Sequence, residues 1–128
     1  MRIGLRFVIA ALILTSAACA QHHGTAAGPQ PARMPVTVNV TNNYKTNVEV
    51  FAVGVGTSYH LGTVAPGIVR SFELPMGMVG GGGYIRLLAQ VTGYGPRVQS
   101  DDLVLSPGDI VNFEITTNFL DSRATVRP

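Results

Sequence analysis

The chain has 128 residues, of which 46% are hydrophobic and only 12% are charged, and its formal net charge is +2. This length suits one domain, and the low charge excludes a highly charged disordered chain. Without Arg2 and Arg6, seven basic residues remain against seven acidic ones. A neutral domain lacks the positive charge on which nucleic-acid binding depends. Trp is absent and aromatic residues make up 7%, which argues against an aromatic platform for sugars or bases.

Residues 1–20 have the three parts of a signal segment in the expected order. Two arginines precede the apolar run FVIAALIL at residues 7–14, and the small residues TSAACA follow at 15–20. The apolar run is shorter than the roughly 20 residues that a permanent membrane anchor needs. We therefore expect residues 1–20 to act as a signal segment that directs export.

Two modes of cleavage fit the end of this segment. Ala18, Cys19 and Ala20 match an A-x-A site, which would release a secreted protein that begins at Gln21. Residues 16–19 also resemble the lipobox of bacterial lipoproteins, although Ser16 stands where Leu is usual. That resemblance implies a lipid-modified Cys19 at the N-terminus, and Ala20 after it implies the outer membrane. We favour lipidation, with free secretion as the alternative.

Residues 21–34 form a segment rich in Gly, Ala, Pro and Gln, which predicts a flexible linker between the membrane anchor and the domain. His22 and His23 could bind a metal ion, but a pair without further ligands makes a poor site, so we interpret them as polar linker residues. Because Cys19 is the only cysteine, no disulfide can stabilise the domain that follows at 35–128.

Apolar residues alternate with polar ones from Val36 onward, as in half-buried strands, and no window shows a helical period. The predicted strands lie at about 36–41, 46–53, 59–64, 69–74, 84–91, 99–105, 110–117 and 123–126. Seven or eight short strands at this spacing predict an all-β fold, a single antiparallel β-sandwich.

Two proline-glycine turns punctuate this pattern, Pro66-Gly67 and Pro107-Gly108, and each predicts a hairpin with a type II turn. The strand pattern over about 35–127 and the segment LSPGDIVNFEI resemble small exported β-sandwich proteins of bacteria, immunoglobulin-like or transthyretin-like, which are often lipoproteins without an assigned function. The resemblance implies an architecture and no functional residues.

Catalytic and metal-binding patterns are missing from the sequence of the domain. A blue-copper site needs two His and a Cys, whereas residues 35–128 contain only His60 and no cysteine. No nucleophile elbow or zinc-protease motif occurs. Asp101, Asp102 and Asp109 are too few for calcium, so we interpret them as solvated charges. We expect a non-catalytic protein without metal or cofactor.

Two loops are the candidate partner-binding surfaces. The first is MGMVGGGG at 76–83, predicted to be a long flexible loop between the sheets that exposes Met76, Met78 and Val79. The second is GYGPR at 93–97, which offers Tyr94 and Arg97, residue types that are enriched at interfaces.

The sequence thus predicts a non-catalytic cell-envelope module that acts structurally or by binding an unknown envelope protein, and that is held to the membrane through Cys19. The expected location is the outer membrane or periplasm, or outside the cell if cleavage follows Ala20. The alternative is an accessory module that binds a small molecule or carbohydrate, which would need a concave site with convergent polar and aromatic groups.

Overall fold

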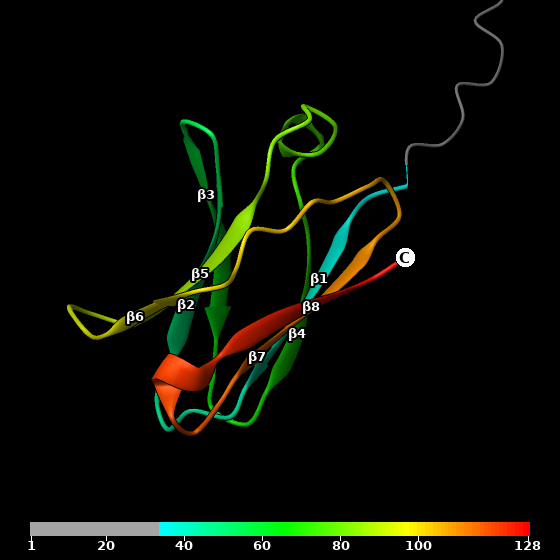
Figure 1. Ribbon diagram of the computed structural model, residues 1–128. Coiled ribbons are helices and arrows are strands. Elements are labelled where there is room, and N and C mark those ends of the chain that lie inside the picture. Colours follow the sequence, from blue (N-terminus) through cyan, green and yellow to red (C-terminus); the bar gives the residue numbers. More distant parts are fainter. Residues whose placement is uncertain (1–33) are drawn as a thin grey trace, which may run out of the picture.

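The computed structural model describes residues 34–128, so the predictions for the signal segment, Cys19, His22 and His23 fall outside the described residues. The all-β sandwich is confirmed, with eight strands in two facing four-stranded sheets (Figure 1). The elements are β1 (Thr37–Asn42), β2 (Val48–Gly54), β3 (Thr57–Val64), β4 (Val69–Glu73), the 3-10 turn η1 (Met76–Met78), β5 (Arg86–Val91), β6 (Arg97–Gln99), β7 (Ile110–Ile115), η2 (Phe119–Asp121) and β8 (Arg123–Arg127). Within this part of the chain, no helix has the length and hydropathy needed to cross a membrane.

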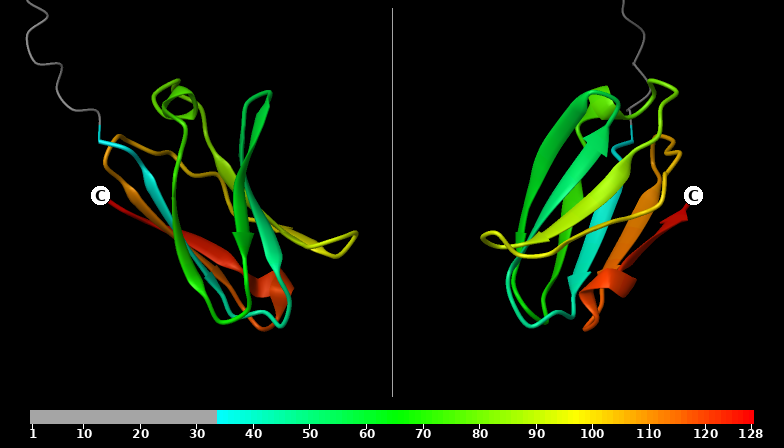
Figure 2. Two further views of the ribbon diagram at one scale, coloured as in Figure 1. Left: turned by 180° about the vertical axis from the view of Figure 1, so that it is seen from behind. Right: turned by 60° about the vertical axis from the view of Figure 1, so that its left-hand side comes forward.

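The two sheets have the strand orders β4-β1-β7-β8 and β3-β2-β5-β6 (Figures 1 and 2). β1 pairs in parallel with β7, whereas the other pairings are antiparallel. In a constant-type immunoglobulin domain the first and second strands share one sheet. Here β1 and β2 lie in different sheets, so the strand order is not that of such a domain.

The core lies between the sheets and follows from the period-two pattern, because alternate side chains of a strand point to the same face. Every second residue is buried throughout β1, and in β2 from Val48 to Ala52. The apolar residues of the core are Val36, Val38, Val40, Val48, Val50, Ala52, Val64, Leu74, Ile85, Leu87, Ala89, Leu103, Leu105, Val111, Phe113, Ile115 and Phe119. Burial of these side chains is the main stabilising contribution in a domain without disulfides.

Both proline-glycine turns form as predicted, since Gly67 and Gly108 have φ values of 73° and 93°. The amide of Ile68 donates to the carbonyl of Ala65 at 3.2 Å, which closes the first turn. Neither turn makes a hairpin, however. The first joins β3 to β4 and the second precedes β7, and both therefore lead from one sheet to the other. The hairpin prediction was wrong because a turn residue specifies only the local bend.

The predicted strand at 99–105 was also wrong in its bounds. β6 ends at Gln99, and the chain then runs as an extended arm toward the other sheet. Leu103 and Leu105 are buried and Val104 is exposed, so the alternation that suggested a strand is present. The amide of Ser100 donates to the carbonyl of Leu87 at 2.8 Å, and beyond it Leu103 pairs with Ile85 through backbone hydrogen bonds of 2.8 and 2.9 Å.

Asn42 at the end of β1 is fully buried and holds the bottom of the sandwich together. Its Nδ2 donates to the carbonyls of Thr46 and Val64, each at 2.9 Å, and its Oδ1 accepts from the amide of Tyr44 at 2.9 Å. Asn is a common turn residue because it tolerates left-handed backbone angles. Among residues 34–128 only glycines have positive φ, so Asn42 acts through its side chain instead.

β3 contains a bulge, since its register against β2 shifts between Val50 and Phe51 and leaves Leu61 without an opposite residue. Gly62 in this bulge has a φ of 155°, and the ring of Phe72 from β4 packs directly over it. A Cβ on Gly62 would lie 2.7 Å from Cε1 of Phe72. The bulge therefore needs glycine here, and Phe72 links the two sheets at their edge.

Candidate functional site

A pocket of about 630 Å³ opens where the two sheets separate, between the tip of the β2–β3 hairpin and the loop at 75–84. Figure 1 and the left view of Figure 2 show the hairpin tip and this loop standing apart at the same end of the sandwich. We call this site the hairpin pocket, and its lining residues are Gly54, Val55, Thr57, Tyr59, Pro75, Gly77, Met78, Gly81, Gly82, Gly83 and Tyr84.

Strand register places the side chains of this pocket. Tyr59 lies opposite Ala52, a fully buried core residue, so Tyr59 shares the inward face of its sheet. The sandwich ends below this level, which leaves Tyr59 48% exposed on a face that is otherwise core. Val55 at the hairpin tip is 75% exposed, and Tyr84, just before β5, is 45% exposed. Three large, partly exposed side chains thus surround the opening.

The glycine-rich loop forms the opposite wall. Met78 in η1 packs against the core, and its Cε would lie 3.4 Å from a Cβ at Gly54. A Cβ at Gly83 would lie 3.5 Å from Cγ2 of Val55. The loop therefore approaches the hairpin closely at these two glycines, and side chains there would narrow the pocket.

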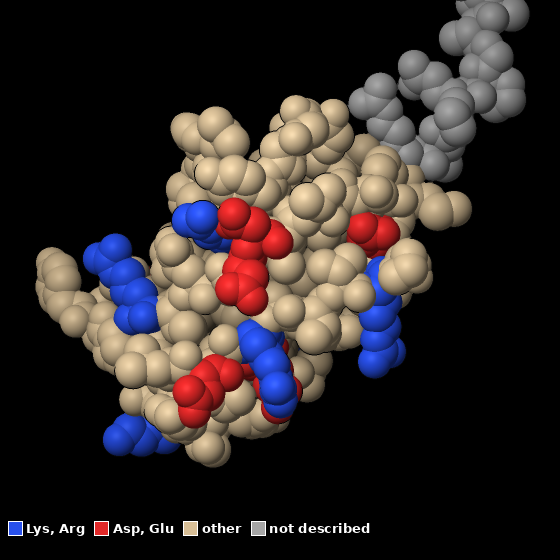
Figure 3. All heavy atoms as spheres, in the orientation of Figure 1, with Lys and Arg blue, Asp and Glu red and all other residues tan. Residues whose placement is uncertain are grey.

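Of the residues that the structure describes, none that lines the hairpin pocket is charged. In Figure 3 the two protrusions at the top of the molecule are tan. Basic and acidic groups lie interspersed over the rest of the face in view. The nearest ion pair joins Arg86 to Asp102, with the guanidinium 5.2 Å from the ring centre of Tyr84. The hydrogen bond from Arg86 to Asp102, together with the carboxylate charge, raises the pKa of Arg86 above its ordinary value. The site thus suits neutral, mainly apolar groups.

The predicted binding loops do not form one surface. Met76 is exposed, but Met78 and Val79 are half-buried against the core, which leaves less of them for a partner. Tyr94 is fully exposed, and Arg97 is the first residue of β6 rather than a loop residue. The two loops lie at opposite ends of β5, about 20 Å apart for a strand of this length.

Sequence reasoning missed Val55, Tyr59 and Tyr84. The tyrosines are separated by 25 positions in the chain and looked scattered, although β3 and β5 both pair with β2 and bring them to one end of the sheet. The usable signal was Gly56 between two strand segments, since an isolated glycine there marks a turn.

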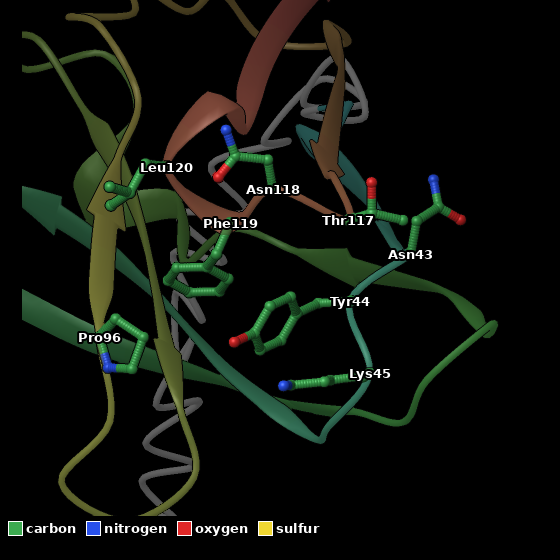
Figure 4. A pocket seen from close by; sticks show the side chains of 8 residues that line it. All are labelled: Asn43, Tyr44, Lys45, Pro96, Thr117, Asn118, Phe119 and Leu120. Carbon is green, nitrogen blue, oxygen red and sulfur yellow. The ribbon is translucent and has the colours of Figure 1, made fainter.

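A second pocket, of about 590 Å³, lies at the other end of the sandwich. It is lined by Asn43, Tyr44, Lys45, Pro96, Thr117, Asn118, Phe119 and Leu120. Figure 4 shows the Tyr44 hydroxyl and the Lys45 amine pointing toward the side where Pro96 lies. The rings of Tyr44 and Phe119 are 5.0 Å apart, and Asn118 donates to Asp121 at 2.5 Å. This end therefore combines aromatic and polar groups.

The residues considered for metal or acid-base chemistry are dispersed. His60 is exposed and lies against Phe51, with ring centres 4.8 Å apart. Asp109 is buried, contrary to the expectation of a solvated charge, and its Oδ2 accepts from the amide of Ser106 at 2.7 Å. It therefore stabilises the turn before β7. In the part of the chain that the structure describes, no three His, Cys, Asp or Glu side chains cluster as metal ligands would.

No family profile matches the chain, and no curated protein matches it. Among solved structures, the chain is similar to an NMR structure of a protein from Eubacterium rectale, with a TM-score of 0.47 and 15% identity. The match covers 77% of this chain and 94% of that one. The class defined by the structure itself is an eight-stranded β-sandwich with an apolar pocket at one end.

Proposed function

We propose that this chain is a non-catalytic interaction module of the bacterial cell envelope that binds another protein at the hairpin pocket. The observation that carries the proposal is the exposure of Val55, Tyr59 and Tyr84 around an uncharged opening. Single exposed apolar side chains are common on soluble proteins. A cluster of them is typical of an interaction site, where a partner covers the apolar surface. Tyrosines also supply contact area at a low entropic cost.

The envelope part of the proposal comes from the N-terminal sequence. A signal segment, a cysteine at the lipobox position and a polar linker fit an exported domain held away from a membrane. We further propose that the chain is a transthyretin-like exported lipoprotein. Of the two kinds of sandwich that the sequence resembles, the immunoglobulin strand order does not fit. Lipidation at Cys19 would place the pocket near other envelope proteins.

Crosslinking followed by affinity capture from the native membranes tests the proposal. Wild-type protein is compared with Val55→Asp, which puts a charge at the mouth of the pocket, and with the matched control Tyr94→Asp at the distant loop. We expect one reproducible partner that Val55→Asp loses and Tyr94→Asp retains. Equal capture by both variants would refute the hairpin pocket as the binding site.

The second candidate function is an accessory module that binds a small molecule or carbohydrate. The pocket of Tyr44, Lys45 and Phe119 favours it, because aromatic and polar groups converge there. A thermal-shift screen with cell-wall sugars and small metabolites separates the two functions. A rise in melting temperature that Tyr44→Ala abolishes supports this candidate.

A further inference from the structure

We propose that the upper half of β3, Thr57–His60, accepts an extended peptide as an added β-strand, with one neutral apolar side chain of that peptide in the hairpin pocket. This inference rests on the proposed function and names the form in which the partner binds. Addition of a strand to a sheet edge provides affinity through backbone hydrogen bonds, while a neighbouring pocket selects the side chain.

Among residues 34–128, β3 is the outer strand of its sheet and pairs with β2 alone. Gly54 and Thr57 close the two-residue hairpin loop, so they form a hydrogen-bonded pair. Hydrogen-bonded and non-hydrogen-bonded pairs alternate along an antiparallel ladder. Ser58, opposite Val53, and His60, opposite Phe51, are therefore non-hydrogen-bonded, and their N–H and C=O groups point away from β2.

The lower half of β3 cannot accept a strand in the same way. The bulge at Leu61 interrupts the regular edge, and Nη1 of Arg70 donates to the carbonyl of Thr63 at 2.7 Å. Bulges and charged side chains are the usual means of protecting an edge. The open stretch therefore spans only Thr57–His60, which limits the paired part of the peptide to about four residues.

The pocket sets the chemistry of the peptide. Thr57 and Tyr59 face inward, toward Pro75 and Gly77 after β4, so a strand added beside β3 would direct alternate side chains into the same space. Since no lining residue carries a charge, an ionised side chain would lose its hydration without a partner. We infer a neutral peptide with an apolar residue at the anchor position.

The test uses a phage-displayed library of eight-residue peptides, selected on the natively processed protein. The best peptide is then synthesised in three forms: unmodified, with N-methyl groups on the odd-numbered backbone nitrogens, and with N-methyl groups on the even-numbered ones. We call the last two the methylation registers. Strand addition predicts that one register weakens binding at least tenfold while the other leaves it within about twofold, because only alternate amides face β3. This comparison leaves the protein unchanged.

Protein variants give the second readout. Ser58→Pro removes an outward N–H, which edge strands tolerate, and Tyr59→Ala shortens a wall of the pocket. Both are expected to lose the peptide, while Tyr94→Ala at the far loop binds it as wild type does. No selected peptide, or equal weakening by both methylation registers, would overturn the proposal.

Two further outcomes separate the strand-addition proposal from the proposed function. If Val55→Asp loses the envelope partner and Ser58→Pro keeps it, the interaction module stands and strand addition is wrong. If sedimentation shows a dimer of the processed protein that Ser58→Pro abolishes, a second copy occupies the edge and the peptide proposal is overturned.

Discussion

Replacement of Gly62 by alanine tests the packing at the β3 bulge. The added Cβ would lie 2.7 Å from Cε1 and 3.2 Å from Cζ of Phe72, well inside contact distance. Overpacking of this kind costs about 1–3 kcal/mol. The φ of 155° adds strain, because side chains rarely adopt that conformation. We expect Gly62→Ala to lower the free energy of unfolding by at least about 2 kcal/mol.

Thermal unfolding followed by circular dichroism measures this loss. In a domain of this size each kcal/mol corresponds to about 4–8 °C, so the melting temperature should fall by about 8–16 °C. The matched control is Gly77→Ala in η1, where a Cβ would meet nothing within 4 Å. That variant should stay within about 0.5 kcal/mol of wild type.

A double-mutant cycle identifies the cause. Phe72→Ala removes the ring that the new Cβ would strike, so Gly62→Ala should cost less in that background than in wild type. The difference between the two costs is the contribution of the clash. If Gly62→Ala costs the same in both backgrounds, the close approach of Phe72 is not what selects glycine, and the reasoning is refuted.

Three further predictions concern buried polar groups and the anchor. Asn42→Ala should lower the free energy of unfolding, measured by urea denaturation, by at least about 2 kcal/mol, because it leaves the buried Val64 carbonyl without the Asn42 donor. A loss as small as that for replacing an exposed asparagine would contradict this. Asp109→Ala should cost about 1–2 kcal/mol, whereas Asp109→Asn, which keeps an acceptor for the Ser106 amide, should cost less; equal losses in urea titrations would exclude the hydrogen bond as the cause. Cys19→Ser in the native host should remove added lipid mass and membrane retention, as intact-mass analysis and fractionation report; an unchanged distribution would favour the secreted form.

Local alternation in the sequence was enough to predict the fold class. Val36, Val38 and Val40 alternate with polar residues, and the same period recurs in seven further segments. Each of these corresponds to a strand of the structure except the segment at 99–105, where the strand ends at Gln99. Period two defines which side chains face inward, and since no segment has a helical period, another sheet must cover that face. The all-β sandwich and most of its core follow from this local pattern.

The candidate site could not be predicted in the same way, because it depends on which strands are neighbours. Tyr59 and Tyr84 meet only because β3 and β5 flank β2, and Tyr59 is exposed only because its hairpin extends beyond the facing sheet. The pairing of β1 with β7 likewise joins segments far apart in the sequence. Alternation determines the faces of each strand, whereas the packing of the two sheets decided where the core ends and the hairpin pocket begins.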